Sequence, residues 1–257
     1  MTTLIAAGDS FTYGSELPDC AGRSSKLTWS ALLAERNGWD YLCIAKPGCG
    51  NQSIARRVID AVSTANEPVV VAVMWTMLGR REVGISPYIA SKLSEHEYNQ
   101  QDLDGNWINL NIWQTQDYDS KRLKFNNPDQ WFNEKLRTQC ELYQQHNIKD
   151  LATHYFNTLS EEDHIRSSCE SIYILQNFLK NRGIPFLFAN VTDDLQAVFT
   201  NGYLGRDLDR SDWITLQGFN DWSTANKYES SPMGHPPEEA HRQWLTEHYK
   251  YIKQDIS

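Results

Sequence analysis

Four short apolar runs, spaced along the chain, constrain the fold more than any other feature of the sequence. Each has the length of a strand, and PVVVAVM is apolar at every position. A strand without polar positions is typical of a parallel sheet that helices cover on both faces. Segments with helical apolar spacing, at 27–36 and 51–65, separate the first three runs. The runs are 3–7, 41–45, 68–74 and 184–191. They predict an α/β chain with three α/β/α layers and a mostly parallel sheet.

The strand and helix pattern lapses between about 83 and 133, where the chain is polar, aromatic and rich in turn residues. Such a stretch is too long for an ordinary connection within a compact domain. We therefore expect a single domain over 1–257 with an insertion or lid at about 83–133. Further helices are expected at 132–145, at 151–182 with a break near 158–160, at 193–199 and at 237–256. Residues 202–228 are expected to be irregular.

Composition narrows the possible partners. The net charge is −9 and the pI about 5.3, which disfavours nucleic acid and anionic membrane surfaces. No apolar run approaches the ~20 residues of a membrane-spanning helix, and MTTLIAAGDS lacks the form of a signal peptide. Five cysteines and seven histidines show no metal-binding spacing. We expect a cytoplasmic protein with no metal and no cofactor; the sequence leaves the oligomeric state open.

The first chemical motif is GDSFTYG, which directly follows the first expected strand. It places Ser10 at the carboxyl edge of a parallel sheet, where α/β proteins build their sites. A serine hydroxyl becomes a useful nucleophile when a base accepts its proton. Backbone N–H groups of the next turn can receive an oxyanion. The alternative interpretation is an Asp–Ser turn or helix cap.

The second motif is GHPPEEAH, near the carboxyl end. His235 lies in the loop before the last expected helix, which would hold it while leaving it free to face a cleft. An isolated histidine is more often a surface residue without a role, but a serine site on the first strand favours a base here. His241 falls inside the helix, where a structural role is favoured.

GDSFTYG, PGCGN and GHPPEEAH together resemble the first, second and fifth sequence blocks of the SGNH (GDSL) hydrolase superfamily, in order along nearly the whole chain. The resemblance implies a flavodoxin-like sheet and hydrolysis of acyl esters. It also implies Ser10 as nucleophile, His235 as general base, and the N–H groups of Ser10 and Gly48 as oxyanion donors. Members encoded by phages have similarly altered third blocks, so it also points to a phage-encoded or particle-associated setting.

Two blocks depart from the family pattern. The third block normally supplies an asparagine as a third oxyanion donor, and here the stretch reads WTML. Asn51 or Thr76 would have to replace it. The family also places an aspartate just before the histidine, where this chain has Pro232 and Met233. Three other residues are candidates for orienting the imidazole. They are Glu229, Ser231 and Asp193.

Arg80, Arg81 and Trp75 follow or end the third expected strand, at the same sheet edge as Ser10. Arginines there are suited to clamp a carboxylate or phosphate, and surface pairing with Glu82 is the alternative. The sequence predicts a serine esterase that acts on a small acyl group. The resemblance to the family and the high aromatic content favour O-acetyl on a carbohydrate as that group. The alternatives are an inactive SGNH-fold module that binds glycan or protein, and an acyltransferase that uses the same residues.

Overall fold

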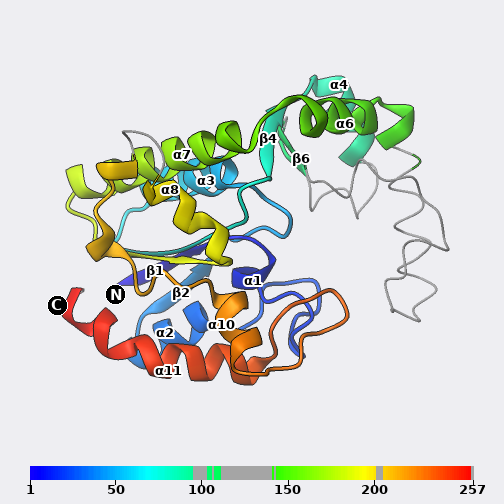
Figure 1. Ribbon diagram of the computed structural model, residues 1–257. Coiled ribbons are helices and arrows are strands. Elements are labelled where there is room, and N and C mark those ends of the chain that lie inside the picture. The colour runs from blue at the N-terminus through cyan, green and yellow to red at the C-terminus, as the bar shows by residue number, and fades with distance from the viewer. Residues whose placement is uncertain (95–102, 106, 111–140, 142, 201–204, 256–257) are drawn as a thin grey trace.

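The centre of the molecule is a four-stranded sheet in the order β2–β1–β3–β7, and every strand pairs in parallel with its neighbours (Figure 1). The computed structural model describes residues 1–94, 103–105, 107–110, 141, 143–200 and 205–255. The strands are β1 (Thr3–Ala7), β2 (Asp40–Cys43), β3 (Val69–Trp75) and β7 (Phe186–Asn190). The four apolar runs therefore form the strands that the sequence predicts, and the chain is an α/β protein with a parallel main sheet.

The buried side chains of each strand divide between two cores, one on each face of the sheet. Ile5, Val71 and Val73 face a core built with α3 and α7. Their neighbours Leu4 and Ala72 face a second core built with α2, α10 and α11. Because successive side chains of a strand point to opposite faces, a strand between two helical layers is apolar throughout. Figure 1 shows these helices above and below the sheet.

Outside the expected insertion, the helices begin and end close to where the sequence predicts, with two differences. They are α1 (Ser10–Tyr13), α2 (Trp29–Asn37), α3 (Asn51–Thr64), α4 (Pro87–Ser94), α6 (Ile148–Thr158), α7 (Glu161–Asn181), α8 (Gln196–Thr200), α10 (Phe219–Ala225) and α11 (Glu238–Asp255), with 3₁₀ turns at Asp193–Leu195 and Arg210–Asp212. The cap of α3 is Gly50, one residue before the expected Asn51. Helix α10 lies in a segment expected to be irregular, because Phe219 and Trp222 bury their rings against α11.

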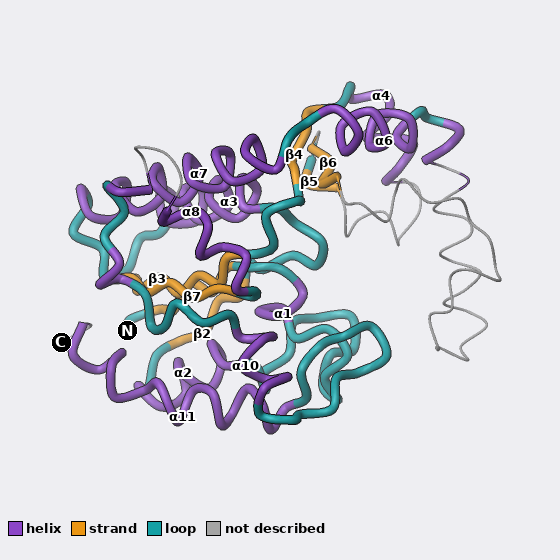
Figure 2. The backbone as a smooth tube through the Cα atoms, viewed as in Figure 1, coloured by secondary structure: helices purple, strands orange, loops and turns teal. Residues whose placement is uncertain are grey.

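The region expected to be an insertion contains a second, antiparallel sheet in the order β4–β6–β5 (Figure 2). Its strands are β4 (Arg81–Gly84), β5 (Leu103–Asp104) and β6 (Trp107–Leu110). Ile108 and Leu110 pack with Leu93 of α4 and with Tyr143 and Ala152 in a third, separate core. These elements with α4 and α6 are called the arm below. The expected helix at 132–145 lies mostly outside the described residues.

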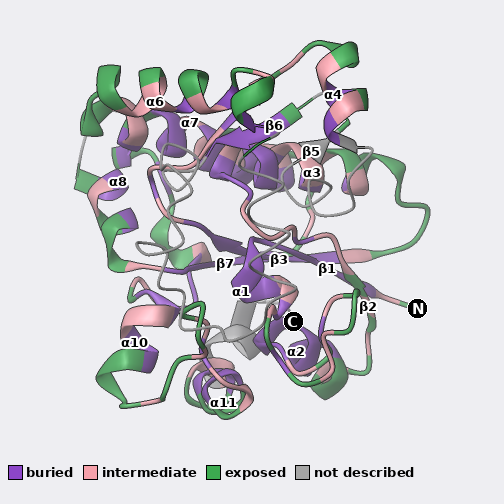
Figure 3. Cartoon of the chain, turned by 90° about the vertical axis from the view of Figure 1, so that its right-hand side faces the viewer, coloured by how far each residue is buried: buried purple, intermediate pink, exposed green. Residues whose placement is uncertain are grey.

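Burial is greatest in the sheet and in the inner faces of the two helical layers (Figure 3). Within the described part of the chain, no helix combines the length and the apolar character that a membrane span requires. Strand β1 begins with Thr3 at the amino edge of the sheet and ends at the carboxyl edge, where α1 follows it. In the view of Figure 3 this carboxyl edge, with α1 at its centre, faces the reader.

Candidate active site

Ser10 is the first residue of α1, immediately beyond the carboxyl end of β1. Asp9 caps this four-residue helix, since its Oδ1 accepts the Phe11 N–H at 3.0 Å. The turn requires glycine at position 8, where φ is +156°, and an added Cβ would lie 2.3 Å from Thr12 Oγ1 and 2.9 Å from the Met74 carbonyl oxygen. The tight turn therefore brings Gly8, two residues before Ser10, close against Met74 of β3.

Asp9 is completely buried, and its second oxygen is the centre of a small polar network. Asp9 Oδ2 accepts from Thr76 Oγ1 and from Arg80 Nη1, both at 2.6 Å, and Arg80 Nη1 also donates to Thr76 Oγ1 at 2.8 Å. A buried carboxylate is tolerated when such donors and an opposite charge satisfy it. The network ties the start of α1 to the loop that follows β3.

Asn51 and Thr76, the expected substitutes for the missing oxyanion donor, hold the loops together instead. Asn51 Nδ2 donates to the Thr76 carbonyl oxygen at 3.1 Å and to Ser168 Oγ at 3.0 Å, and Asn51 Oδ1 accepts the Thr76 N–H at 2.9 Å. The Thr76 hydroxyl donates to Asp9. Both amide protons and the hydroxyl proton are thus engaged, which corrects the expectation for these two residues.

The loop from Lys46 to Gly50 lies beside the turn that leads into Ser10. Lys46 N–H donates to the Gly8 carbonyl oxygen at 3.0 Å, and Cys49 Sγ contacts the same oxygen at 3.2 Å. Gly48 adopts φ +79°, a conformation that favours glycine. Among the described residues, neither the N–H of Gly48 nor that of Ser10 has an acceptor. Two backbone donors on adjacent loops are therefore available to an anion.

His235 is paired with a carboxylate, but with Glu16 rather than with a residue close to it in the sequence. His235 Nδ1 and Glu16 Oε2 are 2.6 Å apart, and the side chains are 11% and 22% exposed. A carboxylate accepts hydrogen bonds, so this contact places the proton of a neutral imidazole on Nδ1 and leaves Nε2 as the acceptor. That tautomer is the one a general base requires.

Glu16 is held in place from several sides. Its backbone is in the left-handed region, with φ +67°, and its carboxylate also accepts from Ser231 Oγ and from the Met233 N–H at 3.3 Å. Burial raises the pKa of Glu16, but the hydrogen bonds from His235 and Ser231 outweigh it and lower the pKa below its ordinary value. A strained backbone held by such contacts is typical of a functional position.

The three expected partners of His235 have different places. Ser231 belongs to the cluster, because its Oγ accepts the His235 backbone N–H at 3.0 Å and donates to Glu16. Glu229 is exposed, and Asp193 accepts the Gly218 N–H at 2.7 Å beyond the end of β7. Glu16 therefore replaces both acids, which corrects that expectation. Glu16 lies only six residues after Ser10, but no pattern in the sequence links it to His235.

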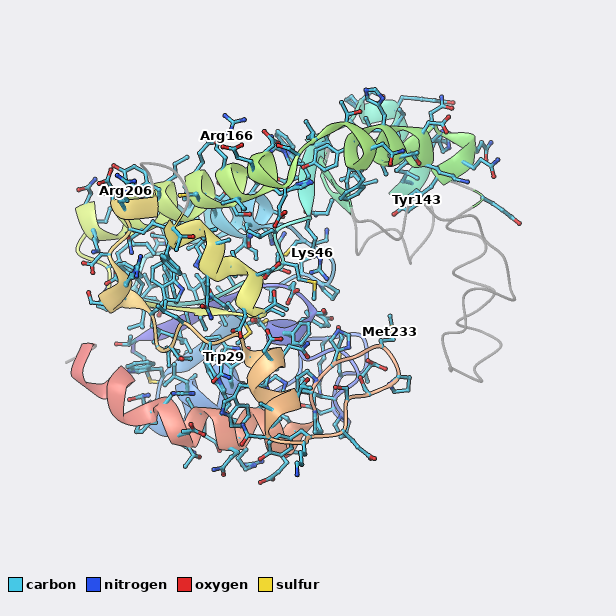
Figure 4. The ribbon with its side chains drawn as sticks, in the orientation of Figure 1. Trp29, Lys46, Tyr143, Arg166, Arg206 and Met233 are labelled. Atoms are coloured by element: carbon cyan, nitrogen blue, oxygen red, sulfur yellow. The ribbon has the colours of Figure 1, made fainter. Side chains whose placement is uncertain are left out.

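The imidazole of His235 lies beside α1, the helix that begins at Ser10. Its ring contacts the ring of Phe11, the residue after Ser10, edge to face with centroids 5.2 Å apart. In the described structure no hydrogen bond joins Ser10 Oγ to His235. Figure 4 shows Lys46, from the loop after β2, and Met233, from the loop before α11, at the same end of the molecule. This edge of the sheet thus brings together a serine, an oriented imidazole and two backbone donors.

The other candidates divide between core and surface. Trp75 is 0% exposed and packs edge to face on Phe188 at 5.2 Å, so it belongs to the core and cannot contact a ligand, which corrects that expectation. Trp107 is 42% exposed on β6, with Arg56 5.7 Å from its ring centroid. Trp113 and Trp131, two other tryptophans of the expected insertion, lie outside the described residues.

A hollow of about 500 Å³ lies at the opposite, amino edge of the sheet, lined among others by Thr2, Trp39 and Pro185. It contains none of the candidate catalytic residues. No group of three or more potential metal-ligating side chains occurs in the described ranges. Comparison of the chain with protein-family models, with curated proteins and with solved structures finds no match.

Proposed function

We propose that the protein is a serine esterase of the SGNH type, which hydrolyses a small acyl ester, O-acetyl on a carbohydrate. The observation that carries this proposal is the Glu16–His235 pair beside the helix that begins at Ser10. An imidazole whose Nδ1 faces a carboxylate has its other nitrogen ready to accept a proton. The available N–H groups of Ser10 and Gly48 support the same reaction.

In this mechanism His235 Nε2 takes the proton of the Ser10 hydroxyl while Ser10 Oγ attacks the ester carbonyl carbon. The carbonyl oxygen becomes an oxyanion, which accepts hydrogen bonds from the Ser10 and Gly48 N–H groups. The carbon–oxygen bond to the alcohol then breaks, and the alcohol leaves with the proton from His235. Water gives a proton to His235 and attacks the acyl carbon; the bond from this carbon to Ser10 Oγ then breaks, His235 returns the proton to Ser10 Oγ, and the carboxylic acid leaves. Glu16 keeps the imidazole oriented throughout.

A binding role without catalysis is favoured by one observation, the absence of a hydrogen bond between Ser10 Oγ and His235 in the described structure. In unliganded enzymes such bonds are often long and tighten when substrate binds, so geometry alone does not decide. A transferase would use the same residues, with a sugar hydroxyl in place of water. Activity measurements separate these functions.

The test is hydrolysis of p-nitrophenyl acetate by the wild type and by Ser10→Ala and His235→Ala. Exposed residues far from the sheet edge provide matched controls, Ser63→Ala on α3 and His154→Ala on α6. The esterase requires that the first two variants fall to background and that the controls retain wild-type rates. A fluorophosphonate probe should label Ser10 in the wild type. Background rates for a folded wild type, with no labelling, would refute the esterase and favour the binding role.

A further inference from the structure

Arg80 contacts two segments of the candidate site, the turn before Ser10 and the loop that carries Gly48. Its Nη1 lies 2.6 Å from Asp9 Oδ2, and Asp9 caps the helix whose first residue is Ser10. Its main chain packs on the loop that carries Gly48, since a Cβ added at Gly50 would lie 2.8 Å from the Arg80 carbonyl oxygen. Arg80 thus joins the turn before Ser10 to the loop that ends at Gly50.

The guanidinium uses only one of its three nitrogens for the protein. Nη1 donates both of its protons, to Asp9 and to Thr76. Among the described residues, Nη2 and Nε have no acceptor, and the side chain is 18% exposed. The buried carboxylate of Asp9 therefore holds the guanidinium in place while three N–H bonds remain for a ligand. A guanidinium fixed in this way matches a carboxylate with two parallel hydrogen bonds.

Arg81, the neighbouring arginine, is oriented differently. The pKa of Asp163 is lowered by its hydrogen bond with Arg166 and further by the charge of Arg81, which places Arg81 near the start of α7. Arg81 also begins β4, opposite Leu110 of β6. It therefore belongs to the junction with the arm and makes no described contact with Asp9. It is a matched control for Arg80.

We propose that Arg80 binds a carboxylate of the substrate, so that the ester attacked by Ser10 is carried by an acidic sugar. This rests on the proposed function. The chain carries a net charge of −9, so an anionic ligand gains nothing from the overall field and requires a local cation. Arg80 is a cation at this sheet edge whose position is fixed and whose donors are only partly used.

The experiment measures binding of glucuronate, of glucose and of inorganic phosphate by NMR titration. The wild type should bind glucuronate more tightly than glucose or phosphate, and Arg80→Gln should weaken glucuronate binding about tenfold or more. Arg81→Gln should leave it unchanged. Since Arg80→Gln leaves Asp9 without its cation, Arg80→Lys provides a second variant that keeps the charge but loses the fork, and it should weaken binding as well. Circular dichroism verifies that each variant is folded.

Unchanged glucuronate binding in a folded Arg80→Lys variant would overturn the proposal, as would binding of phosphate tighter than that of glucuronate. Binding is measured without turnover, so it separates this inference from the esterase. Glucuronate binding in a protein that does not hydrolyse p-nitrophenyl acetate would refute the esterase and leave the role of Arg80 standing. Hydrolysis without glucuronate binding would refute the role of Arg80 alone.

Discussion

His241 makes the stability of the folded protein depend on pH in a calculable way. Its side chain is 1% exposed, Nδ1 accepts the Trp29 N–H at 3.3 Å, and its ring lies 4.7 Å from that of Phe219. Protonation would place a second N–H against the Trp29 N–H and a charge inside an apolar layer. Burial, with a smaller contribution from the charge of His235, lowers the pKa of His241 to about 3.

The size of the effect follows from linkage. A histidine in the unfolded chain has a pKa of about 6.5, whereas His241 in the folded protein has a pKa of about 3. Between these two pH values the unfolded state therefore binds one more proton than the folded state. Stability is therefore lost as pH falls from about 6.5. At pH 5 the loss is about 2 kcal/mol relative to pH 7.5. The lowered pKa of Glu16 acts below its ordinary value of 4.5, outside this window, whereas burial also lowers the pKa of His164, which adds a loss of the same sign within it.

The assay is urea unfolding followed by far-UV circular dichroism at pH 7.5 and at pH 5, for the wild type, for His241→Gln and for His154→Gln. Between pH 7.5 and pH 5 the free energy of unfolding should fall by about 2 kcal/mol more in the wild type than in His241→Gln. His154→Gln, which changes an exposed histidine, should behave like the wild type. The comparison uses only the change with pH, because His241→Gln also alters packing. If the wild type and His241→Gln lose stability equally between the two pH values, the buried neutral histidine is refuted.

Three substitutions test other parts of the structure. Glu16→Gln should lower kcat for p-nitrophenyl acetate about 10²- to 10⁴-fold with little change in KM, because the imidazole loses the carboxylate that fixes its tautomer; wild-type kcat in this variant would contradict the pair. Gly8→Ala should destabilise the protein by more than about 2 kcal/mol in urea unfolding, because the new Cβ collides with Thr12 and with the carbonyl of Met74, and an unchanged midpoint would exclude the tight turn. Trp75→Ala should cost about 3–5 kcal/mol in the same assay and Trp107→Ala about 1 kcal/mol or less, and equal losses would show that Trp75 is not a core residue.

The location of Ser10 could be predicted from the sequence because it depends on local chain geometry. An apolar strand followed by Gly-Asp-Ser leads directly into a tight turn at the carboxyl edge of a parallel sheet. The helix caps Thr28 and Ser160 are equally local, since each side chain accepts from an N–H three residues later. The proposed chemistry at Ser10 remains a prediction.

Residues 16 and 235 pair across a separation in the chain that no periodicity encodes. Glu16 looks like an ordinary turn residue in the sequence, and the acids that the sequence offers as partners of His235 are Glu229 and Asp193. The contact depends on the left-handed backbone at Glu16 and on the bonds from Ser231 and Met233. Trp75 illustrates the same limit, because a tryptophan at a strand end is core or surface according to what lies over it.

The sequence alone determined the layers of this protein, since apolar strands between amphipathic helices have one way to bury their surface. It also determined which edge of the sheet carries Ser10. Tertiary structure decided which acid orients His235, and that Asn51 and Thr76 brace the loops rather than face a ligand. It also separated Arg80 from Arg81, because Arg80 lies in the loop after β3 and Arg81 begins β4, so the two side chains have different neighbours. The spacing of apolar residues, which decides burial, can be read from the sequence. The partner of a polar side chain depends on which loops lie next to it in the folded protein.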